Sequence, residues 1–173
     1  MTVFVDITVV DDSGTTLVLA EPARKIVSLS PHLTELLFSL GAGDRIEATV
    51  DFSDYPEAAL NIPRLGNAFS VSVEAVIEQS PDLIVAWMTG GNHRTFEQLR
   101  ALGYPVFVNE ASSLVGIAVA VQQLGILVGK PDRGLELAES FRVDLERLRQ
   151  SSGGAGSPKV FFQISDAQLY TVN

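Results

Sequence analysis

Residues 25–45 read KIVSLSPHLTELLFSLGAGDR, and this stretch decides the fold class. The apolar run KIVSL at 25–29 has the length and the β-branched content that predict a buried strand. A Ser-Pro pair, which favours a helix start, follows the run directly. The helical pattern over 31–40 then ends at Gly41. The stretch therefore predicts a strand that leads straight into a helix, which is half of a βαβ unit.

The alternation of strand and helix continues along the chain as far as residue 128. Before it, the turn-forming residues DDSG separate two apolar runs, which predicts an N-terminal β-hairpin. Short alternating units build a parallel sheet with helices on both faces, so we expect an α/β fold. The predicted hairpin strands are 3–10 and 15–19, the sheet strands are 25–29, 45–50, 82–87 and 105–109, and the helices are 31–40, 72–80, 92–103 and 113–129.

The C-terminal part of the chain has a different pattern. Residues 131–150 predict a long amphipathic helix, and SSGGAGSP at 151–158 predicts a flexible linker. Residues 159–173 begin with KVFFQIS, which predicts a new strand. Either that strand pairs back onto the sheet, or the chain is a fragment whose second domain is missing.

Composition excludes several classes of function. The chain has 173 residues and a net charge of −9, which argues against nucleic acid as a partner because phosphate binding needs clustered Lys and Arg. It has no Cys, so disulfides, thiolate metal sites and cysteine nucleophiles are excluded. Its first residues, MTVFVDITVVDDSG, lack the basic start and apolar core of a signal peptide. If the protein is exported, we expect its leader to be absent from this chain.

Candidate binding residues follow the predicted strands, because ligands of open α/β sheets lie beyond the carboxyl ends of the strands. Ser30 either only begins a helix or directs the N–H groups of that helix start toward an electron-rich ligand group. His32 lies beside it. Tyr55 is either packed down on its loop or stacks on a ligand. Trp87 is either a core-edge side chain or a cleft wall, with the following Gly-Gly pair open to a ligand.

Signals for an enzyme are poor. The sequence has no nucleophile elbow, no P-loop and no dinucleotide fingerprint after a strand. The two histidines, His32 and His93, have no carboxylates nearby at metal-ligand spacing. We therefore predict no catalytic residue, no metal site and no resident cofactor.

Four segments in this order resemble the substrate-binding proteins of ABC importers, in the helical-backbone class that binds cobalamin, haem and ferric siderophores. They are RKIVSLSPHLTELLFSLGAGDRI, DFSDYPEAALNIPRLG, SVEAVIEQSPDLIVAW and FEQLRALGYPVFV. The resemblance covers about residues 15–165, and the cobalamin-binding members are the most similar. It implies two α/β lobes joined by one rigid helix, with the ligand between them. Residues 1–130 would then be the N-terminal lobe, 131–150 the inter-lobe helix, 151–158 the linker, and 159–173 the first strand of an absent C-terminal lobe.

The resemblance also implies roles for individual residues. Tyr55 and Trp87 match aromatic positions that line the cobalamin cleft, and Tyr170 falls near an aromatic from the other lobe. Glu74 matches a surface Glu that docks on the permease. The loop GNAFSVSVE departs from the cobalamin pattern, because it offers Phe69 where those proteins have a Trp nearby. This departure leaves a related corrinoid, haem or a siderophore open as the ligand.

The function implied is that of a transport receptor, which binds a bulky metal chelate and hands it to an ABC permease in the membrane. The expected location is the periplasm or another extracytoplasmic space. Two alternatives stay open: a zinc or manganese receptor, which needs a nest of His, Asp and Glu, and an enzyme lobe such as a chelatase. A lobe without its mate would expose apolar surface, so a homodimer of the chain is also possible.

Overall fold

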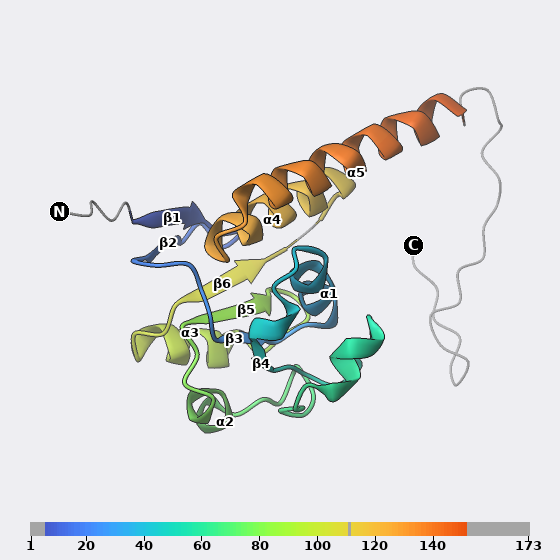
Figure 1. Ribbon diagram of the computed structural model, residues 1–173. Coiled ribbons are helices and arrows are strands. Elements are labelled where there is room, and N and C mark those ends of the chain that lie inside the picture. The colour runs from blue at the N-terminus through green and yellow to red at the C-terminus, as the bar shows by residue number, and fades with distance from the viewer. Residues whose placement is uncertain (1–5, 111, 152–173) are drawn as a thin grey trace. The chain divides into compact units, whose positions relative to one another are not determined.

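The computed structural model describes residues 6–110 and 112–151 (Figure 1). Each predicted strand and helix in these ranges is present, with ends that differ by a few residues. The strands are β1 (Ile7–Val10), β2 (Thr16–Leu19), β3 (Ile26–Ser28), β4 (Ile46–Ala48), β5 (Leu83–Trp87) and β6 (Val106–Asn109). The helices are α1 (Pro31–Ser39), α2 (Val73–Glu78), α3 (His93–Ala101), α4 (Leu114–Leu127) and α5 (Pro131–Ser151), with short 3-10 helices η1 (Gly43–Arg45) and η2 (Glu57–Asn61).

The strands form two separate sheets. Strands β1 and β2 make the predicted antiparallel hairpin, and Gly14 in its turn has a φ of 79°, which suits glycine. The other strands make a parallel sheet in the order β4-β3-β5-β6. The predicted α/β fold with a parallel sheet and an N-terminal hairpin is confirmed.

The parallel sheet is buried on both faces, which explains its continuous apolar strands. Successive side chains of a strand point to opposite faces, so Leu83 and Val85 join one core cluster while Ile84 and Ala86 join the other. The first cluster contains side chains of α1, α4 and the hairpin, and the second contains those of α2 and α3. Helices therefore cover both faces of the sheet, as the sequence predicts, and Figure 1 shows α4 and α3 on opposite sides.

The order of the strands creates a switch point at the carboxyl ends of β3 and β5. The chain runs from β3 to its neighbour β4 and then crosses back to β5 on the other side of β3. After β3 it enters α1 on one face, and after β5 it enters α3 on the other face. Between two such neighbouring strands the connections diverge, and a crevice opens there in α/β sheets.

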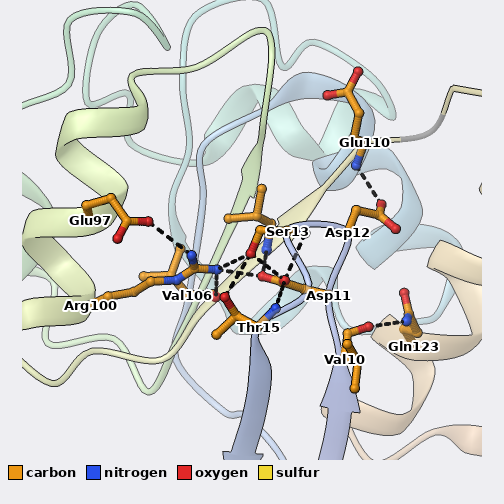
Figure 2. A network of polar contacts seen from close by, with 11 residues as sticks. Val10, Asp11, Asp12, Ser13, Thr15, Glu97, Arg100, Val106, Glu110 and Gln123 are labelled. Atoms are coloured by element: carbon orange, nitrogen blue, oxygen red, sulfur yellow. Dashed lines mark hydrogen bonds and ion pairs between the residues drawn. The ribbon is translucent and has the colours of Figure 1, made fainter.

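A buried carboxylate holds the hairpin against the rest of the fold (Figure 2). The side chain of Asp11 is fully buried and lies 2.5 Å from the guanidinium of Arg100 on α3. It also accepts hydrogen bonds from the backbone N–H groups of Ser13, Thr15 and Val108, each at 3.0 Å. The sequence analysis did not identify this anchor.

The described residues up to Arg142 form one compact unit, and the site described below lies within it. At the start of α5, Gly134 packs against Gly125 of α4, and a Cβ atom on Gly125 would come within 2.9 Å of the Gly134 Cα. Most of the predicted linker and the strand over 159–173 lie outside the described residues, so those domain boundaries stay predictions. In the described ranges, no helix is both long and apolar enough to span a membrane.

Candidate functional site

A small hollow lies at the switch point, beside the last residue of β5. The hollow has a volume of about 310 Å3. At its wall, the ring of Trp87 meets the edge of the His32 ring, with centroids 5.5 Å apart and planes at 88°. The lining residues come from α1, β5, β6 and α4: His32, Glu35, Leu36, Trp87, Asn109, Ile117 and Ala120. The sheet topology thus brings His32 and Trp87 together, although 55 positions separate them in the sequence.

The His32 ring is fixed at both nitrogens. Its Nδ1 lies 2.7 Å from the Ser30 hydroxyl, and its Nε2 lies 3.2 Å from Oδ1 of Asn109. The amide nitrogen of Asn109 donates to Asp12, so its oxygen faces His32 as an acceptor. Nε2 therefore carries the ring proton and Nδ1 accepts from Ser30.

Burial lowers the pKa of His32 below its ordinary value of 6.5, and the hydrogen bond to Asn109 and the charges of Glu35 and Glu110 oppose this only in part. The neutral ring is therefore the favoured form. Because both of its nitrogens are engaged, His32 has no free lone pair to offer a metal. Its place in the site is beside Trp87, whose ring it supports.

Ser30 is fully buried and occupies the residue position before α1, as predicted. Its hydroxyl makes no capping hydrogen bond to the helix, because it bonds to the His32 ring instead. The Ser30 side chain therefore lies under the surface and acts through His32.

Around the start of α1, buried hydroxyls connect three segments of the fold. The hydroxyl of Thr34 on α1 lies 2.8 Å from that of Ser28 at the end of β3. It also lies 2.9 Å from the hydroxyl of Thr49, which donates to Ser53 at 2.8 Å. All four residues are at most 1% exposed. This cluster, which we call the hydroxyl floor, fixes the ends of β3 and β4 relative to α1.

Several aromatic side chains on or beside the strand-end loops are exposed. Tyr55 is 69% exposed, Phe69 is 63% exposed and Trp87 is 36% exposed. Phe52, which the sequence analysis did not single out, is the most exposed at 77% and has a positive φ of 66°. Arg64 binds the backbone of the loop after β4, with a bond of 2.7 Å to the carbonyl of Ser53, and its guanidinium lies 3.5 Å from the Asp54 carboxylate.

The glycines after Trp87 have a use other than ligand approach. Gly90 is buried, and a Cβ atom there would overlap the Trp87 ring itself. A Cβ atom on Gly91 would collide with Phe96. The same loop is fixed to β6 because the Glu110 carboxylate accepts from the N–H of Thr89 at 3.0 Å. The two glycines therefore let the Trp87 ring fold back over its own loop.

The charges at this edge are acidic. In the described strand-end loops (29–30, 49–66, 88–92, 110 and 112–113), Arg64 is the one Lys or Arg, and its guanidinium binds backbone carbonyls. Glu35 lines the hollow, and Asp54 flanks the exposed Tyr55. Over residues 6–110 and 112–151, no group of three His, Asp or Glu side chains is placed to hold a metal ion. Just beyond these loops, Arg94 is exposed in the first turn of α3. The loops themselves are suited to a neutral or cationic ligand with a flat apolar surface.

Glu74 lies at a second hollow, on a different part of the surface. It is exposed in the first turn of α2, where Ser72 caps the helix by accepting from the N–H of Ala75 at 3.1 Å. The hollow there has a volume of about 550 Å3 and shares no lining residue with the one at Trp87. Leu102 of the neighbouring α3 region also lines it and is 59% exposed. Tyr170 lies outside the described residues.

Comparison with known proteins agrees with this architecture. Residues 26–173 match the family described as periplasmic binding protein. The chain is 35% identical over 151 residues to a vitamin B12-binding protein of Vibrio campbellii, covering 87% of this chain and 55% of that protein. It is 33% identical over 152 residues to a vitamin B12-binding protein of Yersinia pestis, covering 88% of this chain and 54% of that protein. The chain thus spans about half the length of these curated relatives.

Solved structures show the same fold. The periplasmic vitamin B12 binding protein of Vibrio cholerae aligns with a TM-score of 0.78 and 34% identity, over 84% of this chain and 57% of that one. A periplasmic haem-binding protein from Roseiflexus sp. RS-1 aligns with a TM-score of 0.71 and 26% identity, over 79% of this chain and 52% of that one.

Proposed function

Because this chain belongs to the periplasmic binding protein family, we propose that it acts as the substrate-binding component of an ABC importer. In this role the protein captures a metal chelate outside the cytoplasm, in a periplasm, and delivers it to a membrane permease. It carries out no chemistry on the ligand. The two strand-end aromatics Trp87 and Tyr55 form part of the binding surface in this proposal.

The observation that carries the proposal is the exposure of aromatic side chains on strand-end loops whose one Lys or Arg, Arg64, binds backbone carbonyls. Large apolar side chains are rarely left in water in a group unless they bind something. Tyr55 and Trp87 can stack on a planar ligand and remove apolar surface from water, at about 25 cal/mol per Å2. Haem propionates and acidic siderophores need Lys or Arg partners, and the described loops offer only the engaged Arg64.

These properties favour a corrinoid over haem or a siderophore. A corrinoid presents a broad apolar ring, which suits aromatic stacking. It also presents amide side chains, which can donate hydrogen bonds to the acidic side chains of this edge. The relatives named vitamin B12-binding proteins, at 31–35% identity, support this choice. Haem is the second candidate, because a haem-binding protein shares the fold at 26% identity and Tyr55 offers an exposed phenol to iron.

The test is a titration of the full-length protein with cobalamin, cobinamide, haem and two ferric siderophores, read by ligand absorbance. We expect tight binding of a corrinoid and a loss of about 30-fold in affinity for Trp87→Ala, since truncating a central aromatic anchor typically costs about 2 kcal/mol. The matched control is Leu102→Ala, an exposed apolar truncation away from the strand ends. Tight binding of zinc or manganese with no binding of any chelate would overturn the proposal.

We also propose that Glu74 contacts basic residues of the permease. An exposed carboxylate beside a hollow is suited to docking, because charge complementarity guides association. Glu74→Ala should abolish ligand uptake by cells while leaving ligand binding intact. Glu78→Ala, an exposed carboxylate at the other end of α2, is the control and should not affect uptake. Equal uptake by both variants would contradict this role.

A further inference from the structure

We infer that Asp12, in the turn of the N-terminal hairpin, is a positioning residue for Trp87. Asp12 is distant from Trp87 in the sequence and belongs to a different sheet. Its carboxylate nevertheless binds Asn109, the last residue of β6, and Glu110, which follows it, and each of these supports a different neighbour of the Trp87 ring. The hairpin thereby determines how firmly the Trp87 ring is held in place.

The first connection runs through the imidazole. Oδ2 of Asp12 accepts from the side-chain amide of Asn109 at 2.9 Å. This bond fixes the amide orientation, so the Asn109 oxygen faces Nε2 of His32 at 3.2 Å. The fixed imidazole edge then meets the Trp87 ring, with centroids 5.5 Å apart. Without Asp12, the Asn109 amide is free to turn, and its NH2 group would then face the N–H of His32.

The second connection runs through the backbone of the same strand end. Oδ2 of Asp12 also accepts from the N–H of Glu110 at 2.6 Å (Figure 2). The Glu110 carboxylate in turn accepts from the N–H and the hydroxyl of Thr89, at 3.0 and 3.1 Å. Thr89 lies two residues after Trp87, in the loop whose buried Gly90 packs under the indole. Oδ2 of Asp12 therefore supports both the His32 ring, which contacts the Trp87 ring, and the loop on which the indole packs.

Anchoring of the hairpin does not depend on these two bonds. Asp11 holds the turn through Arg100 and through the N–H of Val108. Gln123 of α4 donates to the carbonyl of Val10 at 2.7 Å. The N–H of Asp12 itself donates to the carbonyl of Val108 at 3.0 Å. The Asp12 carboxylate is thus free to serve the site, and its removal should leave the hairpin in place.

The test follows the indole directly. The protein is labelled with fluorotryptophan, and the 19F resonance of Trp87 is identified by its loss in Trp87→Phe. We expect Asp12→Ala to shift and broaden this resonance in the absence of ligand. Asp12→Asn keeps an oxygen that can accept both hydrogen bonds and should restore the native resonance. The control is Asp6→Ala, which removes an exposed carboxylate just before β1.

Two results would overturn the inference: an unchanged Trp87 resonance in Asp12→Ala, or the same shift in Asp6→Ala. If Asp12→Ala does not fold, Asn109→Ala removes the first connection while leaving the hairpin anchored by Asp11, and its Trp87 resonance should also move. An unmoved resonance in that variant would equally overturn the inference.

The consequence for binding rests on the proposed function, whereas the ordering of Trp87 does not. In the full-length protein, Asp12→Ala should weaken corrinoid binding about 2- to 10-fold, the factor that corresponds to one net hydrogen bond. If the unmodified protein binds no corrinoid, the proposed ligand is wrong, and the 19F result still decides the role of Asp12.

Discussion

Replacing Arg100 by Leu should destabilise the protein strongly, because it leaves the buried carboxylate of Asp11 without its counter-charge. The Arg100 side chain is 18% exposed and that of Asp11 is 0% exposed, so water can replace little of the lost interaction. Removing one partner of a buried ion pair costs about 3–5 kcal/mol. Asp11 keeps its N–H donors from Ser13, Thr15 and Val108, so we expect the lower end, about 3 kcal/mol.

Urea unfolding followed by circular dichroism measures this loss. The matched control is Arg133→Leu, which removes the same side chain from a pair with Glu136 whose members are 46% and 67% exposed. Exposed pairs contribute about 0.2–1 kcal/mol, so the control should lose at most that amount. Hydrogen exchange should show the greatest loss of protection in the hairpin.

The double variant Asp11→Leu/Arg100→Leu separates the ion pair from simple loss of packing. Removing both partners leaves no uncompensated charge, but it also removes the acceptor of three backbone N–H groups, so the double variant should lose less unfolding free energy than the two single variants summed. A loss in Arg100→Leu no larger than in Arg133→Leu would refute the reasoning. Additive losses from the two single variants would do the same, because they would show that the groups are not coupled.

Three further outcomes follow from the site. Burial lowers the pKa of His32, so below pH 6.5 the unfolded chain takes up a proton that the folded protein resists. The free energy of unfolding should therefore fall as the pH drops through the folded-state pKa. Urea midpoints measured at several pH values should show a shallower fall for His32→Gln than for the native protein, and His93→Gln is the control. Gly90→Ala should displace the Trp87 ring and shift the indole emission, and unchanged emission would show that the loop adapts without moving the ring. Thr34→Val should lower the unfolding free energy by about 2 kcal/mol, because it leaves hydroxyl partners in the floor unsatisfied, and calorimetry would show whether it does.

The order of elements could be predicted from the sequence because each one has a local cause. Apolar runs predicted the strands. The predicted helices 72–80 and 92–103 begin at Ser72 and Asn92, which cap them in the structure, because capping depends on the residues that follow immediately. The place of Tyr55 and Trp87 at the strand ends followed from the rule that parallel strands end at one edge, whereas the sequence left open whether their side chains are packed down or exposed.

The contacts that organise the site could not be predicted, because they join residues far apart in the chain. Asp12 and Asn109 are separated by 97 positions, and His32 and Asn109 by 77. The periodic pattern of apolar residues along the sequence does not indicate such pairs. Ser30 shows the limit within a local motif: its position before the helix was predicted, but its hydroxyl binds the His32 ring, which became its neighbour only through the conformation of the helix start.

The hydroxyl floor has a consequence for how the surface of this fold can change over time. Side chains of the floor are fully enclosed and bound to one another, whereas Phe52, Tyr55 and Phe69 have most of their surface in solvent. Substitutions at exposed positions usually alter stability by less than about 0.5 kcal/mol. These exposed aromatic residues can therefore be substituted one at a time with little loss of stability. A fold of this kind can acquire a new surface, and with it new ligands, while its hydroxyl floor stays the same.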